Sequence, residues 1–289
     1  MPDGARYART QANSAYHRRP PLVNSPAGCY NSRKRALPAA PEKRRGAGRA
    51  AGRRCDVLQT VFLDIDDTLF DFHRAEACAL RETLDTLDVP SDDGVIARYS
   101  AINAALWAQL EDGEVTREEV LTQRFVRLFA VLGLERSAER ARDLYEHLLG
   151  EQEFLMPGAL DTLKTLAAEG YDVYLASNGV ADVKDRCIAR AGFAPYIRGA
   201  FISERIGCNK PDPAFFAHCF ATIPGFCREA SIIVGDSLSS DIRGGLRAGI
   251  RTCWYNPTGK PCRSDIRPDY TVARLCELPP LFARLRAAR

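Results

Sequence analysis

The segment Leu58-Gln-Thr-Val-Phe-Leu-Asp-Ile-Asp-Asp-Thr68 decides how this chain folds, because it joins a buried strand to a pair of acidic residues. Its first half is rich in β-branched and aromatic residues, which predicts a short strand beginning at Val57 or Leu58. Asp64 and Asp66 stand two residues apart at the end of that strand. An isolated D-x-D-x-T can equally be a polar turn, so its meaning depends on the segments further along the chain.

Three further polar segments come after it in order. Ser177-Asn-Gly179 ends a strand with a hydroxyl group and free backbone N–H groups. Lys210 comes next, within the run Asn209-Lys-Pro-Asp-Pro213. Asp236 ends another buried strand, and Asp241 lies one helical turn later. Each segment alone has a plain structural interpretation, as a turn or as a solvated lysine, but the four in sequence outweigh those separate interpretations.

The order of strand and helix patterns predicts the fold class. From Pro157 onward we expect helices at 158–168, 180–191, 213–222, 239–248 and near 274–286, alternating with strands at 171–177, 199–203, 231–235 and 250–255. Such alternation indicates right-handed βαβ units and an α/β fold with a doubly wound, Rossmann-like parallel sheet. Ligands of these sheets bind beyond the carboxyl ends of the strands, so Asp64, Ser177 and Asp236 should converge on one crevice. Neither the P-loop pattern G-x-x-x-x-G-K-[ST] nor the dinucleotide-binding pattern G-x-G-x-x-G occurs, so the usual phosphate-binding loops are absent from the sequence.

Between these parts of the chain the patterns are helical. Leu80 and Leu84 keep helical spacing, and Thr116-Arg-Glu-Glu119 is a capping box that opens another helix. We therefore expect residues 73–155 to form an inserted helical subdomain, and residues 57–72 together with 156–289 to form the α/β core.

Charge is unevenly distributed along the 289 residues. Residues 1–55 hold 13 Lys and Arg against only Asp3 and Glu42, a net charge of +11, whereas the remainder carries −8. This segment is rich in Arg, Pro, Ala and Gly without helical periodicity, so we expect residues 1–56 to be a disordered basic leader, an organelle transit peptide, or upstream sequence from a wrongly assigned start. The acidic body argues against broad nucleic-acid binding.

The expected localisation rests on features that the sequence lacks. No stretch approaches the roughly 18 uninterrupted apolar residues that a membrane span needs, and the first 55 residues contain no secretory h-region. The ten cysteines form no C-x-x-C pair and do not cluster with the four histidines as zinc ligands would. We therefore expect a cytoplasmic protein with reduced thiols and with neither a membrane nor a nucleic acid as partner.

The residue types of the four segments suit phosphoryl transfer. Two carboxylates, with a third from another strand, favour a hard cation such as Mg²⁺, which prefers oxygen ligands. Ser177 and Lys210 supply one neutral and one positively charged donor for phosphate oxygens. The set matches transfer through an aspartyl-phosphate.

With the four motifs in order across residues 58–255, the chain resembles the haloacid dehalogenase superfamily, and the helical insert resembles that family's C1 cap, a lid over the site. The resemblance implies Asp64 as the nucleophile and Asp66 as the general acid/base. It implies phosphate binding by Ser177, Asn178 and Lys210. It further implies Mg²⁺ ligation by the carboxylates of Asp64 and Asp236 and the backbone carbonyl of Asp66, with Asp241 a supporting acid behind them.

Other segments are similar to noncanonical pyrimidine 5′-nucleotidases. They are Asn103-Ala-Ala-Leu-Trp107, Glu111-Asp-Gly113, Thr116, Arg124-Phe125, Ile202-Ser-Glu-Arg-Ile-Gly207 and Thr252-Cys-Trp-Tyr-Asn256. This similarity implies a Mg²⁺-dependent hydrolase whose small-molecule substrates are pyrimidine nucleoside monophosphates. Phe70 and Trp107 are the aromatic candidates for contacting the base, and the alternative for Trp107 is a packed core residue.

Three alternatives stay open at this point. The substrate could be another small phosphomonoester, such as phosphoglycolate or a sugar phosphate, and a sugar-phosphate mutase would share the same motifs. Haloacid dehalogenation is disfavoured, because breaking a C–halogen bond needs neither leaving-group protonation nor Mg²⁺, whereas Asp66 and Asp236 are both present. From a different class, a nucleic-acid-binding protein led by its basic arm would bind with steep salt dependence that is lost on deleting residues 1–55.

Overall fold

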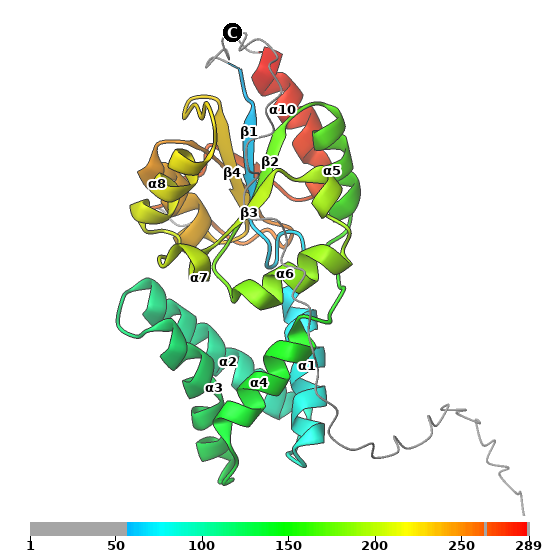
Figure 1. Cartoon of the computed structure of the whole chain (residues 1–289), viewed down its shortest axis with the longest axis vertical. Helices are drawn as coiled ribbons and strands as arrows, with labels where there is room; N and C mark the ends of the chain where they lie inside the picture. The colour runs from blue at the N-terminus through cyan, green and yellow to red at the C-terminus, as the bar shows by residue number, and fades with distance from the viewer. Residues whose placement is uncertain (1–56, 263–264, 288–289) are drawn as a thin grey trace, which may run out of the picture. The chain divides into compact units, whose positions relative to one another are not determined.

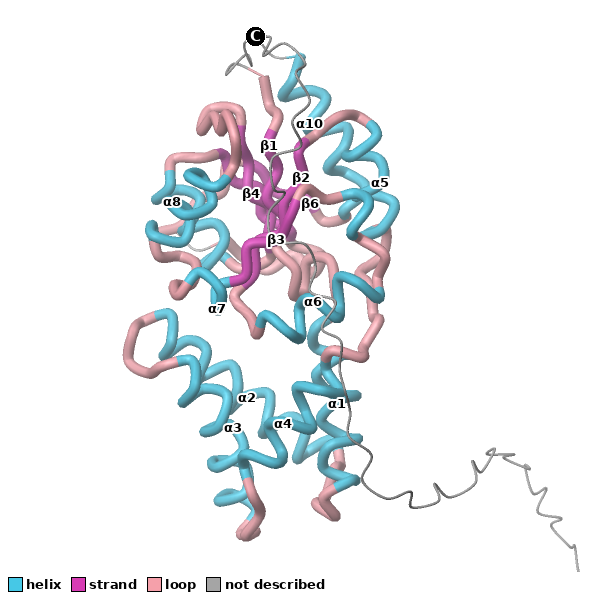
Figure 2. Tube along the Cα trace, viewed as in Figure 1, coloured by secondary structure: helices cyan, strands magenta, loops and turns pink. Residues whose placement is uncertain are grey.

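The computed structural model describes residues 57–262 and 265–287, and the leader expected over residues 1–56 lies outside them. Its centre is a six-stranded parallel sheet in the order β3-β2-β1-β4-β5-β6 (Figure 1, Figure 2). The strands are β1 (Thr60–Leu63), β2 (Asp172–Ser177), β3 (Gly199–Ile202), β4 (Ser231–Gly235), β5 (Arg251–Tyr255) and β6 (Tyr270–Val272). The expected doubly wound sheet is confirmed, and β6 is an addition, since three residues at a sheet edge are too few to show periodicity.

Helices cover both faces of the sheet. Figure 1 shows α5 and α10 on one side and α8 on the other. The helices of this part are α5 (Ala159–Ala168), α6 (Ala181–Arg190), α7 (Ser203–Ile206), α8 (Pro213–Thr222), α9 (Arg243–Ala248) and α10 (Leu278–Ala287), with short helical turns η1 (Ala194–Tyr196), η2 (Leu238–Ile242) and η3 (Leu275–Glu277). Covering both faces leaves the central strands β1 and β4 buried along their whole length.

The register of the central strands aligns their carboxyl ends. Leu63, the last residue of β1, lies opposite Val234 of β4 and Leu175 of β2. The residues immediately after these strands, among them Asp64 and Asp236, therefore emerge at one edge of the sheet. This edge includes the switch point between β1 and β4, where the winding of the sheet reverses.

The segment between β1 and α5 is helical, as expected. It contains α1 (Phe72–Thr86), α2 (Asp93–Glu111), α3 (Arg117–Leu132) and α4 (Ala138–Leu149). Helix α1 packs against α4, α2 against α3, and α3 against α4. The capping box is present, because Thr116 Oγ1 accepts a hydrogen bond from Glu119 N while the Glu119 carboxylate accepts one from Thr116 N.

The chain enters and leaves this helical segment through two linkers that lie side by side. Asp71 N donates to Phe154 O and Met156 N donates to Leu69 O, both at 2.9 Å. The boundary predicted at 155/156 lies within this paired crossing, whereas the one predicted at 72/73 lies just inside α1. We propose on this basis that residues 73–155 act as a cap on an α/β core.

One expected helix differs in detail. The run predicted as a helix over 239–248 begins with the wide turn η2 and continues as α9. Ser237 Oγ accepts from Ser240 N at 3.1 Å, and the Asp241 carboxylate accepts from Ser237 N at 3.2 Å. These side-chain bonds compete with regular helical bonding and turn Asp241 inward.

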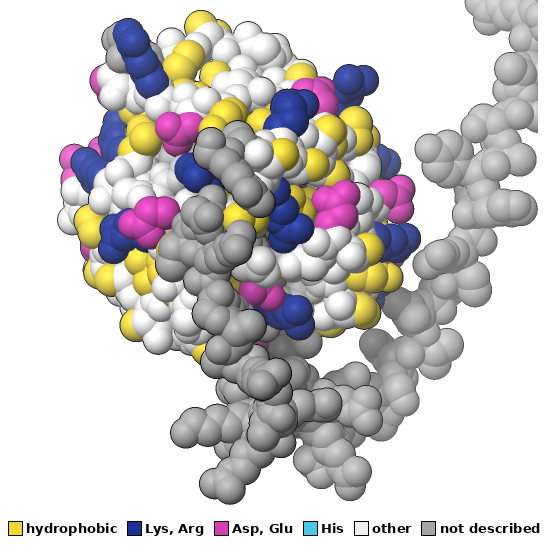
Figure 3. Space-filling view, turned by 90° about the horizontal axis from the view of Figure 1, so that it is seen from above, with side chains coloured by type: hydrophobic (Ala, Val, Ile, Leu, Met, Phe, Trp, Pro, Cys, Tyr) yellow, Lys and Arg dark blue, Asp and Glu magenta, His cyan; other side chains and the backbone are white. Residues whose placement is uncertain are grey.

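The described surface carries mixed charge. Lys and Arg side chains are interspersed with Asp and Glu side chains on the face shown in Figure 3. Such mixing is typical of a solvated surface. Among the described helices, none combines the length and the apolar character needed to cross a membrane.

We expect Gly245→Ala to destabilise the protein by about 1–3 kcal/mol, the usual range for overpacking. A Cβ at Gly245 of α9 would lie 2.5 Å from Ile233 Cγ2 and 2.8 Å from Thr252 Cγ2, so the helix would have to move off the sheet. Denaturant unfolding measures the change. Arg247→Ala, on the exposed side of the same helix, is the control and should shift the unfolding free energy by no more than about 0.5 kcal/mol. Equal effects of the two changes would contradict this packing.

Candidate active site

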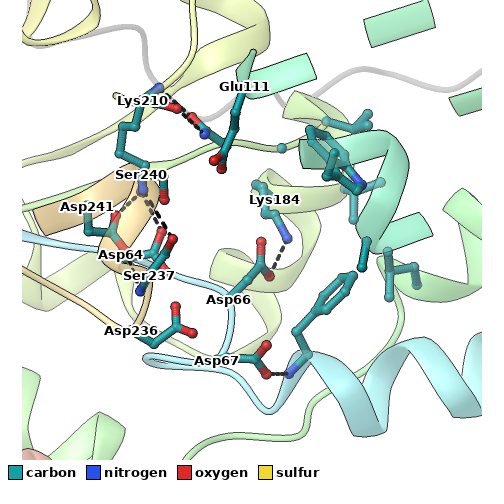
Figure 4. Close-up of a pocket in the computed structure, with 18 of the residues that line it drawn as sticks. Asp64, Asp66, Asp67, Glu111, Lys184, Lys210, Asp236, Ser237, Ser240 and Asp241 are labelled. Carbon is teal, nitrogen blue, oxygen red and sulfur yellow. Dashed lines mark hydrogen bonds and ion pairs between the residues drawn. The ribbon is translucent and has the colours of Figure 1, made fainter. Parts of the chain in front are cut away.

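A buried lysine holds the centre of the site (Figure 4). The Lys210 side chain is 1% exposed, and its Nζ donates at 2.6 Å to Asp64 Oδ1, to Asp241 Oδ1 and to the carbonyl of Ala176. These bonds use all the N–H donors of the ammonium group. Burial lowers the pKa of Lys210, but the charges of Asp241 and Asp64 outweigh it and raise the pKa well above its usual value.

Two local features bring the acidic residues together. Thr68 Oγ1 donates to Asp64 Oδ2 at 3.2 Å and accepts from Asp236 N at 3.1 Å, so it fastens the loop after β1 to the loop after β4. A Cβ at Gly235 would lie 2.1 Å from Asp241 Oδ2. Only glycine at the end of β4 lets the Asp241 side chain fold back toward Lys210.

Three carboxylates lie close together at this site, and two of them contact Lys210. Asp64, Asp236 and Asp241 each offer an oxygen atom, and these atoms lie within 4.8 Å of one another. Burial, with the charges of Asp241 and Asp66, raises the pKa of Asp64 to about 7 against the opposing effect of Lys210. Burial, with the charges of Asp64 and Asp241, raises the pKa of Asp236 to about 9. The cluster holds more negative charge than Lys210 offsets, and its hard oxygen donors fit Mg²⁺.

A second buried lysine, Lys184, pairs with Asp66 and was not identified from the sequence. Lys184 of α6 is buried and its Nζ lies 2.6 Å from Asp66 Oδ1 (Figure 4). Burial lowers the pKa of Lys184, but the Asp66 charge outweighs it and the pKa is raised overall. The available signal was a lysine within the apolar stripe of α6, beside Val183 and Cys187, which are also buried.

Ser177 and Asn178, both expected to bind phosphate, differ in their hydrogen bonds. The Ser177 hydroxyl is buried at the end of β2 and has no hydrogen-bond partner within the described ranges. Ser177 directly follows Ala176, whose carbonyl accepts from Lys210, and an orphaned donor at this position fits a ligand with oxygen acceptors. The Asn178 side chain instead bonds the backbone of Lys210, accepting from its N at 2.8 Å and donating to its O at 2.7 Å. In this structure Asn178 therefore positions the lysine.

A cavity of about 370 Å³ opens beside the carboxylates and lies within the range of small-molecule sites. Core residues at its charged end include Asp64, Asp66, Lys184, Lys210, Asp236 and Asp241. Cap residues on its wall include Trp107, which is half-buried. The indole Nε1 of Trp107 donates to Asn103 Oδ1 at 3.1 Å, and Asn103 Nδ2 donates to the buried Glu76 at 2.8 Å. This chain of bonds fixes the Trp107 ring.

Phe70, the other aromatic residue expected to contact the base, does not line the cavity, whereas Phe72 does. Phe70 is buried and packs on Phe193, with 5.4 Å between ring centroids, and it is not among the residues lining the cavity. Phe72, at the start of α1, lines the cavity instead. Phe70 is held by backbone bridges to Asp66 and Leu155, whereas the backbone N of Phe72 donates to the Asp67 carboxylate at 3.0 Å.

One arginine joins the helical segment to the motif loops. Arg117, the first residue of α3, donates to Gly179 O at 2.7 Å, to Ser203 Oγ at 2.6 Å and to Asn209 Oδ1. Gly179 directly follows Asn178, and Asn209 directly precedes Lys210. One contact between the cap helices and the core thus runs through the loops that carry the Ser177 and Lys210 motifs.

We expect Arg117→Met to loosen these loops. Loss of three hydrogen bonds, each worth about 0.5–1.5 kcal/mol, should speed amide hydrogen exchange in residues 203–209 by roughly tenfold or more. Hydrogen exchange with mass spectrometry checks this at peptide resolution. Arg127→Met, at an exposed position of the same helix, should leave the exchange unchanged. Unchanged exchange in both variants would show that Arg117 does not hold the loops.

Comparison with known proteins agrees with this geometry. The haloacid dehalogenase-like hydrolase family matches residues 58–249. The chain is 37% identical to HAD-hydrolase YfnB of Bacillus subtilis, over 76% of this chain and 93% of YfnB. The crystal structure of YfnB bound to magnesium matches the fold with a TM-score of 0.75 at 36% identity, covering 78% of this chain and 99% of that one.

Two further relatives are named for an activity. Pyrimidine 5′-nucleotidase PynA of Streptococcus pneumoniae is 36% identical, over 73% of this chain and 90% of PynA. Pyrimidine 5′-nucleotidase YjjG of Escherichia coli is 28% identical, over 78% of this chain and 97% of YjjG. Sequence, fold and family match agree, and the chain belongs to the haloacid dehalogenase-like hydrolases.

Proposed function

We propose that this hydrolase is a Mg²⁺-dependent phosphomonoesterase that acts through an aspartyl-phosphate on Asp64. The observation that carries the proposal is the cluster of Asp64, Asp236 and Asp241 at the end of a substrate-sized cavity, with Lys210 bonded to Asp64 and Asp241. Phosphate-monoester hydrolysis is among the slowest uncatalysed reactions, with enhancements of up to ~10²¹, so a nucleophile, an acid and positive charge are needed together. Each has a candidate here.

The reaction would proceed in two steps. In the first, a carboxylate oxygen of Asp64 attacks phosphorus while Asp66 protonates the leaving oxygen of the alcohol. In the second, Asp66 takes a proton from water, which attacks the phosphorus of the aspartyl-phosphate and releases inorganic phosphate. The Ser177 hydroxyl, which has no hydrogen-bond partner among the described residues, donates to a phosphoryl oxygen. Lys210 does so by exchanging one of its three present acceptors for the phosphoryl oxygen. Lys184 holds the Asp66 carboxylate at the cavity wall between steps.

Asp64, Asp236 and the backbone carbonyl of Asp66 would hold the metal ion. When bound, Mg²⁺ supplies positive charge against the phosphoryl oxygens. The raised pKa values of Asp64 and Asp236 support this assignment, because a nearby cation would favour the ionised carboxylates, which burial and the neighbouring negative charges disfavour. Asp241, whose oxygens accept from Lys210 and Ser237 N, holds the lysine in place.

For the substrate we propose pyrimidine nucleoside monophosphates. The names of PynA and YjjG support this choice, and so does Trp107 on the cap wall of the cavity. The phosphate end is common to all monoesters, so discrimination has to come from the cap. A flat aromatic ring held by hydrogen bonds suits contact with a planar base.

The experiment that tests the function is phosphate release by the full chain from a panel of substrates, with Mg²⁺ present or chelated. We expect the highest kcat/KM for pyrimidine nucleoside monophosphates, and loss of turnover on chelation that added Mg²⁺ restores. Higher kcat/KM for phosphoglycolate or a sugar phosphate would contradict the substrate assignment. Activity that survives chelation would contradict the metal requirement.

Asp64→Asn should abolish turnover while substrate still binds. Removing a nucleophile costs roughly 10⁴-fold or more in kcat, since the amide cannot attack phosphorus. Phosphate release measures kcat, and calorimetric titration with the substrate measures binding. Asp182→Asn, an exposed carboxylate on α6, is the control and should behave as wild type. Turnover of Asp64→Asn within tenfold of wild type would rule out Asp64 as the nucleophile.

Trp107→Ala should affect substrate choice more than chemistry. We expect KM for pyrimidine monophosphates to rise by roughly 5- to 150-fold, from a stacking energy of ~1–3 kcal/mol per base. Hydrolysis of p-nitrophenyl phosphate should continue about as before. If activity toward both substrates falls in parallel and the protein melts at lower temperature, Trp107 is a packing residue.

A further inference from the structure

The cap side of the cavity is mostly apolar, with one charged pair in it. Its wall includes Phe72, Ala104, Leu121 and Leu149 alongside Trp107. Of the charged cap residues on the wall, Glu111 belongs to the catalytic end, where it hydrogen bonds to Ser239 and is influenced by Asp241 and Lys210. The others are Arg124 of α3 and Glu146 of α4. An apolar pocket with few, well-placed polar groups is typical of sites that orient a ligand.

The Arg124–Glu146 pair is held rigidly. Arg124 Nη2 lies 3.0 Å from Glu146 Oε1, and Arg124 Nε donates to Leu121 O at 3.1 Å. The guanidinium also lies over the Tyr145 ring, 4.7 Å from its centroid. Arg124 is 4% and Glu146 21% exposed, so little motion is available to the arginine. The pair is therefore fixed before any ligand arrives.

Part of the hydrogen-bonding capacity of this pair is unused. Within the described ranges, neither Nη1 of Arg124 nor Oε2 of Glu146 has a hydrogen-bond partner. The pair thus offers the cavity a donor next to an acceptor. Burial raises the pKa of Glu146 against the opposing effects of Arg124 and Arg142, so this carboxylate has given up solvation that no second protein donor replaces.

Joining α3 to α4 does not account for the pair. Buried ion pairs are weak evidence for stability, because desolvation offsets their attraction. A polar link between these helices already exists outside the cavity, where Arg142 Nη1 donates to Thr122 Oγ1 at 3.3 Å. The position of Arg124 and Glu146 on the cavity wall points to recognition of a ligand.

We propose that Arg124 and Glu146 form a base-reading pair for the pyrimidine ring, an inference that rests on the proposed function. On uracil, Arg124 Nη1 donates to a ring carbonyl oxygen and Glu146 Oε2 accepts from the neighbouring N3–H. On cytosine, Arg124 Nη1 donates to ring N3 and Glu146 Oε2 accepts from the neighbouring amino group. Reading the Watson–Crick edge by hydrogen bonds, with an aromatic side chain on the ring face, is an established way for enzymes to recognise a base.

The test compares uridine monophosphate (UMP), its N3-methyl derivative and p-nitrophenyl phosphate. N3-methylation removes the donor that Glu146 would accept. Wild type should prefer UMP over the methylated nucleotide by roughly 10- to 150-fold in kcat/KM, the range expected for a hydrogen bond to a charged group. Arg124→Met/Glu146→Met replaces the pair by apolar side chains of similar length, which a cap often tolerates. This variant should lose the preference and keep hydrolysis of p-nitrophenyl phosphate.

Glu146→Gln is a second variant that keeps the shape of the pair. The new amide oxygen can still accept from Arg124, and the NH₂ group of the same amide then faces the ring N–H. Two donors would oppose each other, so kcat/KM for UMP should fall, whereas kcat/KM for the methylated nucleotide should not. Arg142→Met is the matched control and should leave the preference of wild type intact. The base-reading pair is overturned if the double variant and Glu146→Gln both keep the preference for UMP over the methylated nucleotide. It is also overturned if kcat/KM for UMP and for p-nitrophenyl phosphate fall equally in these two variants. If wild type itself shows no preference for UMP over p-nitrophenyl phosphate, the proposed substrate fails together with the pair.

Discussion

The structure of this site depends on one buried ammonium group. Lys210 lies between Asp64 and Asp241, and without it these two carboxylates would share a desolvated pocket with Asp236 and have no cation in contact with them. Residues at the end of β2 hold Lys210 in place. The Asn178 side chain hydrogen bonds to the Lys210 backbone N and O, and Ala176 O accepts from Lys210 Nζ. Lys210 thus connects the carboxyl ends of β1, β2 and β4, while the excess of negative charge leaves the pocket suited to a divalent cation.

Much of this could be predicted from the sequence, because the signals were local. Asp64 and Asp236 directly follow apolar runs, and the carboxyl ends of parallel strands meet at one edge of a sheet. Their proximity is therefore a consequence of strand order alone. The capping box at Thr116 was also readable, since it depends on residues three apart. The edge strand Tyr270–Val272 was not, because its pairing with β5 is a tertiary contact.

Side-chain partners across elements could not be predicted, and they account for most of what the structure adds. Lys184 reaches Asp66 over 118 positions of sequence, and Arg117 reaches Asn209 over 92. No periodicity reports such contacts. Phe70 and Phe72 differ by two positions, and of the two only Phe72 lines the cavity. The result is a cavity with a charged end built by the core and a largely apolar wall built by the cap.

The central claim is that a covalent bond forms between phosphorus and Asp64. The most direct measurement is acid quenching of the enzyme during turnover of a pyrimidine monophosphate with Mg²⁺ present, followed by mass spectrometry of the peptides. We expect a phosphoryl group on the peptide containing Asp64, formed at least as fast as phosphate is released and absent from Asp64→Asn. Phosphate release at full rate with no phosphorylated peptide, or with the phosphoryl group on another residue, would contradict the claim.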